Sequence, residues 1–231
     1  MQKNIILAGV GGQGILSMAF CICNAALKKG LDFKQSEVHG MSQRGGAVES
    51  HVRFSSDPIR SDIIPRGKAD VVLSIEPLEV LRYVHFLSPE GVLVVSTVPY
   101  ENIPNYPPTE FLLDKISVFR RHVLIDSGRL AKLAGSPHCG NMVMLGAAAS
   151  DIEMEVSAFD KFVTMLFGKK SQRVVDTNLK ALRLGVVVAE LFRKHAEEGM
   201  ETRKVLQAIE EVSDDSLLEQ AEKLLPAGQD A

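Results

Sequence analysis

The chain has 231 residues, which fits one large domain or one domain with an appendage and is long enough to bury a core without disulfides or metals. Hydrophobic residues make up 45% and charged residues 24%, so the composition is that of a soluble globular protein and excludes a mainly disordered chain. The formal net charge of −3 argues against a general nucleic-acid binder, and no apolar run approaches the ~18 residues that span a membrane.

The first 150 residues alternate short apolar segments with segments of helical periodicity. Residues 15–29 carry Ile15, Ala19 and Ile22 on one face of a helix, and Gly30 follows as a stop signal. By the same criteria we predict strands over residues 4–8, 33–38, 48–54, 70–75, 92–97 and 122–126, and helices over 15–29 and 77–87.

The character of the chain changes later in the sequence. Residues 99–108 hold four prolines and are predicted to be a loop. After Gly140, helices with short breaks are predicted over residues 141–150, 156–167, 174–198 and 202–225.

Strands interleaved with helices predict an α/β fold, a three-layer α/β/α domain with a largely parallel sheet and a helical C-terminal third. We place the main domain at residues 1–200 and a helical extension packed on it at residues 201–231.

The first motif is a glycine turn between the first predicted strand and helix. Residues 9–14 (GVGGQG) match G-x-G-x-x-G, and Glu37 lies 23 residues after Gly14. Such a turn lets backbone N–H groups approach a phosphate at a helix N-terminus. It is equally explained as a tight strand-to-helix connection without a ligand, because glycine supplies positive φ and close packing. Both interpretations stay open at this point.

The second motif is the polar segment 36–46 (SEVHGMSQRGG) between the second and third predicted strands. A plain connection needs only two to six residues and little chemistry. Here Arg44 offers a forked cation for a carboxylate or phosphate, and His39 can donate, accept or titrate. The alternative is a surface loop with a solvated arginine. Because loops at strand ends carry sites in α/β sheets, we favour a functional role.

The three cysteines do not predict a metal or cluster site. Cys21 and Cys23 are two residues apart in a predicted helix and therefore face different sides, and Cys139 is alone. An odd number of cysteines without framework spacing is typical of a reducing cytoplasm, which is the location we expect. Near Cys139, Asn141 is interpreted as a helix cap.

Taken together, the two motifs resemble the small, gamma-type subunit of 2-oxoacid:ferredoxin oxidoreductases. The second motif is long and specific, and its EVHGM part favours the indolepyruvate type over the pyruvate and 2-oxoglutarate types. The resemblance spans about residues 4–195 and is carried by residues 10–14 (VGGQG), 36–46 (SEVHGMSQRGG), 50–53 (SHVR), 69–71 (ADV), 76–79 (EPLE) and 141–146 (NMVMLG).

The resemblance implies an accessory subunit that lacks activity alone. The family's reaction decarboxylates a 2-oxo acid on thiamine diphosphate, transfers the acyl group to coenzyme A and passes two electrons through iron–sulfur clusters to ferredoxin. Thiamine diphosphate, magnesium and the clusters are expected in a large partner subunit, and ferredoxin is reached only indirectly. For this chain we expect no catalytic residue, no metal and no bound cofactor, with coenzyme A as a co-substrate of the complex.

We expect both motifs at the carboxyl ends of neighbouring parallel strands, facing the large subunit at the edge of its active site. There His39, Gln43 and Arg44 would help bind an anionic group of coenzyme A or of the substrate. The predicted substrate, coenzyme A or interface residues are His39, Gln43, Arg44, Gly45 and Gly46, and the predicted turn consists of Gly9, Gly11, Gly12, Gln13 and Gly14.

Two other functions remain open. The first is a stand-alone NAD-binding oxidoreductase of the Rossmann type that uses the glycine turn. The second is a pure assembly module that contacts neither substrate nor coenzyme A. Tight nicotinamide binding would support the first, and co-purification with a large thiamine- and cluster-containing chain would argue against it.

Overall fold

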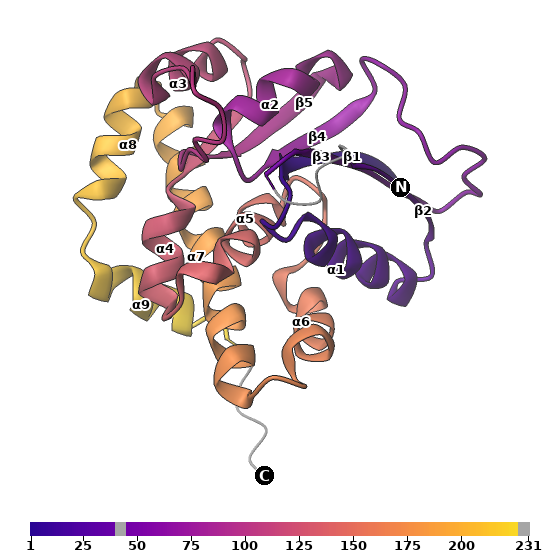
Figure 1. Cartoon of the computed structure of the whole chain (residues 1–231). Coiled ribbons are helices and arrows are strands. Elements are labelled where there is room, and N and C mark those ends of the chain that lie inside the picture. Colours follow the sequence, from indigo (N-terminus) through magenta and orange to yellow (C-terminus); the bar gives the residue numbers. More distant parts are fainter. Residues whose placement is uncertain (40–44, 226–231) are drawn as a thin grey trace.

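A computed structural model describes residues 1–39 and 45–225 of the chain (Figure 1). Its strands form one sheet with the order β2-β3-β1-β4-β5-β6. The strands are β1 (Gln2–Val10), β2 (Asp32–His39), β3 (Ala47–Ser55), β4 (Ala69–Ser74), β5 (Leu87–Ser96) and β6 (His122–Ile125). The helices are α1 (Ile15–Lys28), α2 (Pro77–Tyr83), α3 (Thr109–Ser117), α4 (Ser127–Ala134), α5 (Gly140–Ala148), α6 (Asp160–Phe167), α7 (Gln172–Glu197), α8 (Thr202–Glu210) and α9 (Asp214–Glu222).

The sheet is largely parallel, as predicted, but β1 and β2 are not neighbours. The pairs β1–β4, β4–β5 and β5–β6 are parallel, whereas β3 lies between β1 and β2 and is antiparallel to both. The prediction of adjacent parallel strands for the two motifs is therefore wrong. Strand β3 runs back along β2 and pairs with β1 on its other side. Since β1 and β2 still run in the same direction, their carboxyl ends lie at one edge of the sheet.

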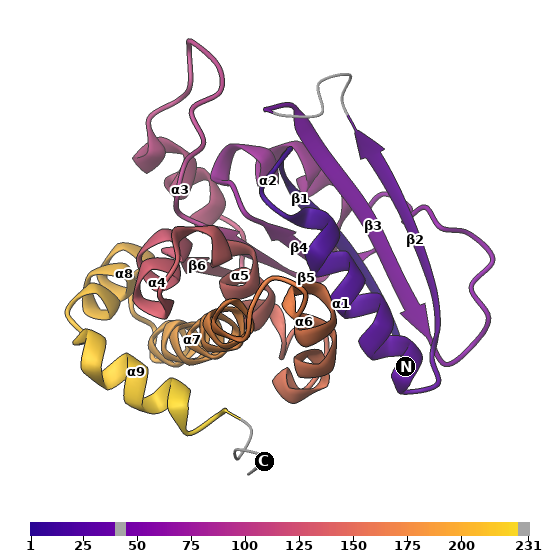
Figure 2. The same cartoon turned by 60° about the horizontal axis from the view of Figure 1, so that its bottom comes forward.

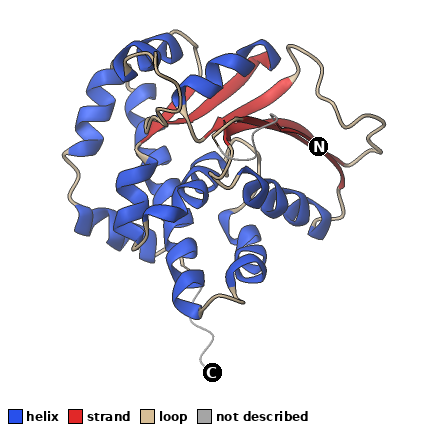
Figure 3. Cartoon of the chain, in the orientation of Figure 1, coloured by secondary structure: helices blue, strands red, loops and turns tan. Residues whose placement is uncertain are grey.

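Helices cover both faces of the sheet, which confirms the three-layer α/β/α prediction (Figures 1 and 3). On one face α2 packs against β1, β4 and β5. On the other face α1 packs against β2 and β3, while α5 and α7 lie against β5 and β6. Within the part of the chain that the structure describes, no helix combines the length and apolar character required to cross a membrane.

Two short helices, α3 and α4, were not among the predicted elements. The eight residues of α4 are too few for a periodic signal, and its ends are fixed instead by two capping residues. The Asp126 carboxylate accepts a hydrogen bond from the Arg129 amide, and Gly135 ends the helix in the left-handed conformation. The predicted helices 77–87 and 156–167 are also partly 3₁₀, over Val84–Phe86 and Val156–Phe159.

The core of the helical layer is the crossing of α5 and α7. Residues 141–148 of α5 are all buried, as expected for a helix that is apolar on every side. The two backbones touch at a glycine from each helix. A Cβ on Gly146 would lie 1.9 Å from the Leu182 carbonyl oxygen, and one on Gly185 would lie 1.9 Å from that of Val143. This crossing therefore has room for no side chain at either position.

The last two helices pack against α7 (Figure 2). Side chains of α4 and β6 anchor them. The Arg129 guanidinium, on α4, donates to the carbonyl oxygens of Ile209 at 3.2 Å and Val212 at 2.8 Å, where α8 ends. It also pairs with the Asp214 carboxylate at 2.8 Å, at the start of α9. At the other end of α8, the His122 Nε2 atom lies 2.9 Å from the Thr202 hydroxyl.

Candidate functional site

The glycine turn, residues 9–14, and the Gly45–Gly46 pair of the second motif lie against each other at the carboxyl edge of the sheet. The Gly11 amide donates to the Gly46 carbonyl oxygen at 2.8 Å, and the Gly45 amide donates to the Gly11 carbonyl oxygen at 3.3 Å. The Gly45 carbonyl oxygen in turn accepts a hydrogen bond from the Asn102 side-chain Nδ2 at 2.7 Å. Two motifs that are far apart in the sequence are thus one backbone-paired unit, held from the side by the proline-rich loop 97–108.

The turn itself requires its glycines for two different reasons. Gly12 and Gly14 adopt φ values of +101° and +85°, in the region that favours glycine. Gly9 instead leaves room for its neighbours, because a Cβ there would lie 2.9 Å from both the Gln13 Oε1 and the Ile15 Cδ1 atoms, and these side-chain ends would have to shift. Gln13 folds back over the turn, and its Oε1 accepts a hydrogen bond from the Val10 amide at 2.7 Å. The Gln13 side chain therefore stabilises the turn from within.

Asn141 fixes the far side of the turn and is not a helix cap. Helix α5 begins at Gly140, and Asn141 Nδ2 donates to the Gly14 carbonyl oxygen at 3.3 Å. A Cβ on Gly14 would lie 2.4 Å from that Nδ2 atom. The buried Oδ1 of Asn141 accepts no hydrogen bond from the described residues. The cap interpretation of Asn141 is wrong because its true partner is 127 positions away, where local sequence gives no signal.

A hollow of about 240 Å³ opens at the glycine turn. Its wall is apolar, with Leu16 half exposed at the start of α1. Gly12 and Gly14 line this hollow, and their amides donate to none of the described residues. Lining residues are Val10, Gly11, Gly12, Gly14, Ile15, Leu16 and Val48. The hollow thus combines apolar surface with backbone donors, which suits a group that is partly apolar and partly anionic.

The remaining predicted site residues are placed only in part. His39 ends β2 opposite Val48, so its backbone lies at the same edge of the sheet, but its side chain is outside the description. Gln43 and Arg44 lie outside the described residues.

Sequence reasoning missed a buried carboxylate beside this unit. Glu76 is only 1% exposed and caps α2, and it accepts hydrogen bonds from the Glu79 amide at 2.7 Å and the Tyr100 amide at 3.4 Å. The Tyr106 hydroxyl donates to the same carboxylate. Glu76 therefore ties the loop 97–108, which also holds Gly45, to the end of β4. An acidic residue directly before Pro77 is a helix-start signal that would have identified the cap.

A second acidic residue, Glu79, is buried next to Glu76. Its Oε1 atom pairs with the Arg82 guanidinium at 3.2 Å, while its Oε2 has no partner among the described residues. Burial raises the pKa of Glu79 above its usual value, with a smaller contribution from the neighbouring Glu76 charge. Glu79 therefore holds its proton to a higher pH than a solvent-exposed glutamate does.

The cysteines do not form a metal site in the described chain. Cys21 and Cys23 are buried in α1, and Cys139 is buried just before α5. Burial raises the pKa of the Cys21 and Cys23 thiols to about 12 and that of Cys139 to about 11, so all three stay protonated. Among residues 1–39 and 45–225, no group of three potential ligands is placed to hold a metal ion. An iron–sulfur cluster does not fit these residues.

Comparison with known proteins gives a match over most of the chain. Residues 4–188 match the family described as pyruvate ferredoxin/flavodoxin oxidoreductase. The indolepyruvate oxidoreductase subunit IorB of Pyrococcus horikoshii is 36% identical over 197 residues, which are 82% of this chain and 96% of that protein. The pyruvate synthase subunit PorC of Thermotoga maritima is 28% identical over 179 residues, which are 77% of this chain and 89% of that protein.

The fold is also found among solved structures. The 2-oxoglutarate:ferredoxin oxidoreductase of Magnetococcus marinus, solved with 2-oxoglutarate, coenzyme A and succinyl-CoA bound, superposes with a TM-score of 0.68 at 24% identity, covering 82% of this chain and 31% of that chain. From its sequence and its fold, the chain belongs to the pyruvate ferredoxin/flavodoxin oxidoreductase family, as a small subunit of the 2-oxoacid:ferredoxin oxidoreductase type.

Proposed function

We propose that this chain is the accessory subunit of a complex that oxidises an aryl 2-oxo acid, with indolepyruvate as the first candidate. The observation that carries the proposal is the identity pattern. Four relatives named as indolepyruvate oxidoreductase subunits are 33–36% identical, whereas the pyruvate and 2-oxoglutarate relatives are 23–28% identical.

In the proposed complex, the bond between the carboxyl carbon and the keto carbon breaks and carbon dioxide leaves. The acyl group forms a thioester with coenzyme A, the thiol proton is released, and two electrons pass to two molecules of ferredoxin. Thiamine diphosphate, magnesium and the iron–sulfur clusters belong to the large partner subunit. This chain alone is then colourless and does not oxidise 2-oxo acids.

The carboxyl edge of the sheet is the part of this chain that we assign to the partner and to coenzyme A. The hollow at the glycine turn offers apolar surface and the amides of Gly12 and Gly14. In the sequence, Arg44 directly precedes the Gly45–Gly46 pair that bonds to Gly11. Its guanidinium is the proposed partner of an anionic group, a coenzyme A phosphate or the substrate carboxylate.

Co-expression with the proposed large subunit from the same organism tests the assignment. The complex is expected to co-purify and to reduce ferredoxin with indolepyruvate faster than with pyruvate or 2-oxoglutarate. The isolated chain is expected to show no such activity and no absorption shoulder near ~400 nm, where iron–sulfur clusters absorb. Equal or greater kcat/KM with pyruvate overturns the substrate assignment, and a brown, active isolated chain overturns the accessory role.

Arg44 is tested in the reconstituted complex. Arg44→Ala is expected to raise the KM for coenzyme A or the 2-oxo acid, or to prevent assembly, at a cost of roughly 2–5 kcal/mol for truncating a buried interfacial cation. Arg44→Lys should not rescue, because lysine lacks the bidentate fork. If Arg44→Ala only lowers the Tm of the isolated subunit and the assembled enzyme keeps its kinetics, Arg44 is structural.

The stand-alone nicotinamide enzyme is the less favoured function. The Gly11 amide is already bonded to Gly46, and Gln13 is folded over the turn, so fewer donors remain for a pyrophosphate. Calorimetry of the isolated chain with NAD and NADP is expected to show no binding in the micromolar range.

A further inference from the structure

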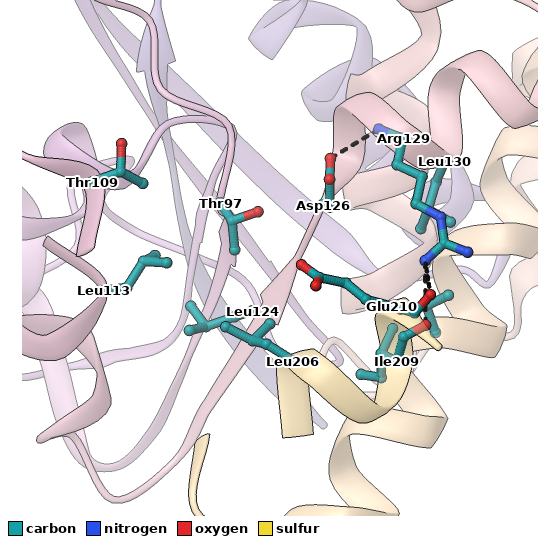
Figure 4. Close-up of a pocket in the computed structure, with 11 residues that line it drawn as sticks. Thr97, Thr109, Leu113, Leu124, Asp126, Arg129, Leu130, Leu206, Ile209 and Glu210 are labelled. Carbon is teal, nitrogen blue, oxygen red and sulfur yellow. Dashed lines mark hydrogen bonds between the residues drawn. The ribbon is translucent and has the colours of Figure 1, made fainter. Parts of the chain in front are cut away.

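A cavity of about 220 Å³ lies at the other end of the carboxyl edge, beyond β5 and β6 (Figure 4). Thr97 follows β5 and Asp126 follows β6, so the cavity lies at the strand ends where α/β sheets place ligands. It is remote from the glycine turn in the strand order, because β4 separates β1 from β5. Its opposite wall is α8, which supplies Leu206, Ile209 and Glu210.

One wall of this cavity, helix α8, lies outside the region of the chain that matches the family. The family match ends at residue 188, and α8 begins at Thr202. Arg129 holds the C-terminal end of α8 through the carbonyl oxygens of Ile209 and Val212 and through Asp214. The wall is therefore anchored in place from the α4 side.

The body of the cavity is apolar and its rim is acidic. Leu113, Leu124 and Leu206 face the interior from three different elements. Figure 4 shows the Glu210 side chain extended across the cavity toward Thr97 and Asp126. Asp126 already accepts one hydrogen bond, from the Arg129 amide, but no described residue forms an ion pair with the Glu210 carboxylate.

The Arg129 guanidinium lies at the rim of the cavity but is not free to bind an anionic ligand. The Arg129 guanidinium is engaged by Asp214 and by the last carbonyl groups of α8, so its charge and its donors are used within the protein. Among the described residues, the rim thus presents one carboxylate without an ion-pair partner, that of the exposed Glu210, next to the exposed and partly engaged Asp126. A neutral or anionic head group finds no matching charge there, whereas an ammonium group does.

We propose that this cavity binds a small organic amine, with its apolar body between α8 and β6 and its ammonium group beside Glu210. The hydroxyl of Thr97, which lies between Asp126 and Thr109 in Figure 4 and also lines the cavity, is an acceptor for a further ammonium proton. The proposal is independent of the assignment of the glycine turn and of the oxidoreductase partner.

Three probes with one hydrocarbon body test the proposal on the full chain at pH 7: hexylamine, hexanol and hexanoate. Binding is measured from the amide chemical shifts of residues 124–130 and 206–210. Hexylamine is expected to bind more tightly than hexanol, and hexanoate is expected not to bind. Failure of hexylamine to shift these amides, or equal binding of hexanoate, overturns the proposal.

Two carboxylates at the end of α8 provide a matched pair of variants. Glu210→Gln is expected to weaken hexylamine about three- to fivefold, the size of a partly exposed charge pair, and to leave hexanol unchanged. Glu211→Gln, at an exposed neighbour that does not line the cavity, should leave both unchanged. Equal losses in the two variants would mean general surface attraction and would overturn the site.

Filling the cavity gives a separate test. Leu206→Trp is expected to abolish the binding of hexylamine and hexanol together. Retained binding by a folded Leu206→Trp protein shows that the probes bind elsewhere. If this variant does not fold, the Glu210 and Glu211 pair still decides the matter.

Discussion

Glu76 shows how one side chain positions the candidate site. Its carboxylate is almost fully buried and is satisfied by two amides and the Tyr106 hydroxyl. A buried carboxylate that loses a donor keeps its desolvation cost without the compensating hydrogen bond. The loop that carries Tyr106 also carries Asn102, which holds Gly45. A substitution that disturbs the hydrogen bonds of Glu76 is therefore expected to destabilise the pairing of the glycine turn with Gly45 and Gly46.

Tyr106→Phe tests this connection. We expect a loss of about 1–3 kcal/mol in the free energy of unfolding, because one donor to a buried carboxylate is removed. Hydrogen exchange should also become faster at residues 100–102. Tyr100→Phe is the matched control, since Tyr100 contacts Glu76 through its backbone amide and the residue is 45% exposed. Equal losses in the two variants, measured by urea unfolding, would contradict the role of Tyr106.

Glu79 provides a pH-dependent test at the same scale. Because burial raises its pKa in the folded chain, the folded state holds the proton more firmly than the unfolded state does. Ionisation of Glu79 therefore destabilises the fold, and the free energy of unfolding falls as the pH rises from its ordinary pKa of 4.5 through the raised value.

Glu79→Gln removes this contribution. The variant should match wild type below the ordinary pKa and become relatively more stable as the pH rises, with a constant difference above the raised pKa. The exposed Glu90, changed to Gln, is the control and should leave the profile unchanged. Denaturant unfolding between pH 4 and pH 8 measures the difference, and a Glu79→Gln protein that is less stable at pH 8 than at pH 4, relative to wild type, would contradict the assignment.

At the scale of elements, the crossing of α5 and α7 depends on the absence of a side chain. Gly146→Ala would place a methyl group 1.9 Å from the Leu182 carbonyl oxygen, so the two helices must separate. We expect a loss of roughly 1–3 kcal/mol, the usual cost of overpacking. Thermal unfolding measures it.

Gly140→Ala is the control for this change, because it is a Gly-to-Ala change in the same helix. Gly140 has φ −58°, and a Cβ there meets its nearest neighbour, the Ser127 hydroxyl, at 3.5 Å. It should be neutral or stabilise the chain by about 0.4–1 kcal/mol, because alanine restricts the unfolded state. A neutral Gly146→Ala would show that the helices tolerate separation.

The elements that sequence reasoning recovered are those with local signals. Apolar segments identified every strand of the sheet, and helical periodicity over 174–198 identified α7. The place of β3 between β1 and β2 was not recovered, because pairing direction depends on contacts between distant segments. The pairing of Gly11 with Gly46 was anticipated only as proximity at one edge. Asn141 was misassigned because its partner, Gly14, is far along the chain. The contact of Glu76 with Tyr106 was missed for the same reason, although its local cap role had a signal in the sequence.

At the scale of the whole molecule, the proposed interface and the proposed amine cavity lie at opposite ends of the carboxyl edge. Complex formation should therefore protect residues 11–16 and 45–48 from hydrogen exchange and leave residues 202–222 unchanged. Exchange measured by mass spectrometry on the chain with and without its large subunit tests this. Protection confined to α8 and α9 would show that the large subunit binds at these helices and not at the glycine turn, which would contradict the proposed interface.

The burial of the three thiols has a practical consequence for such measurements. A thiol with its pKa raised to about 11 or 12 has almost no thiolate at pH 7, and a maleimide or disulfide reagent reacts with the thiolate. A cysteine introduced at an exposed position such as Glu211 would react first and selectively in the native chain. The wild-type background thus accepts a single fluorophore or spin label without removal of its own cysteines, and distances to a partner subunit become accessible in solution.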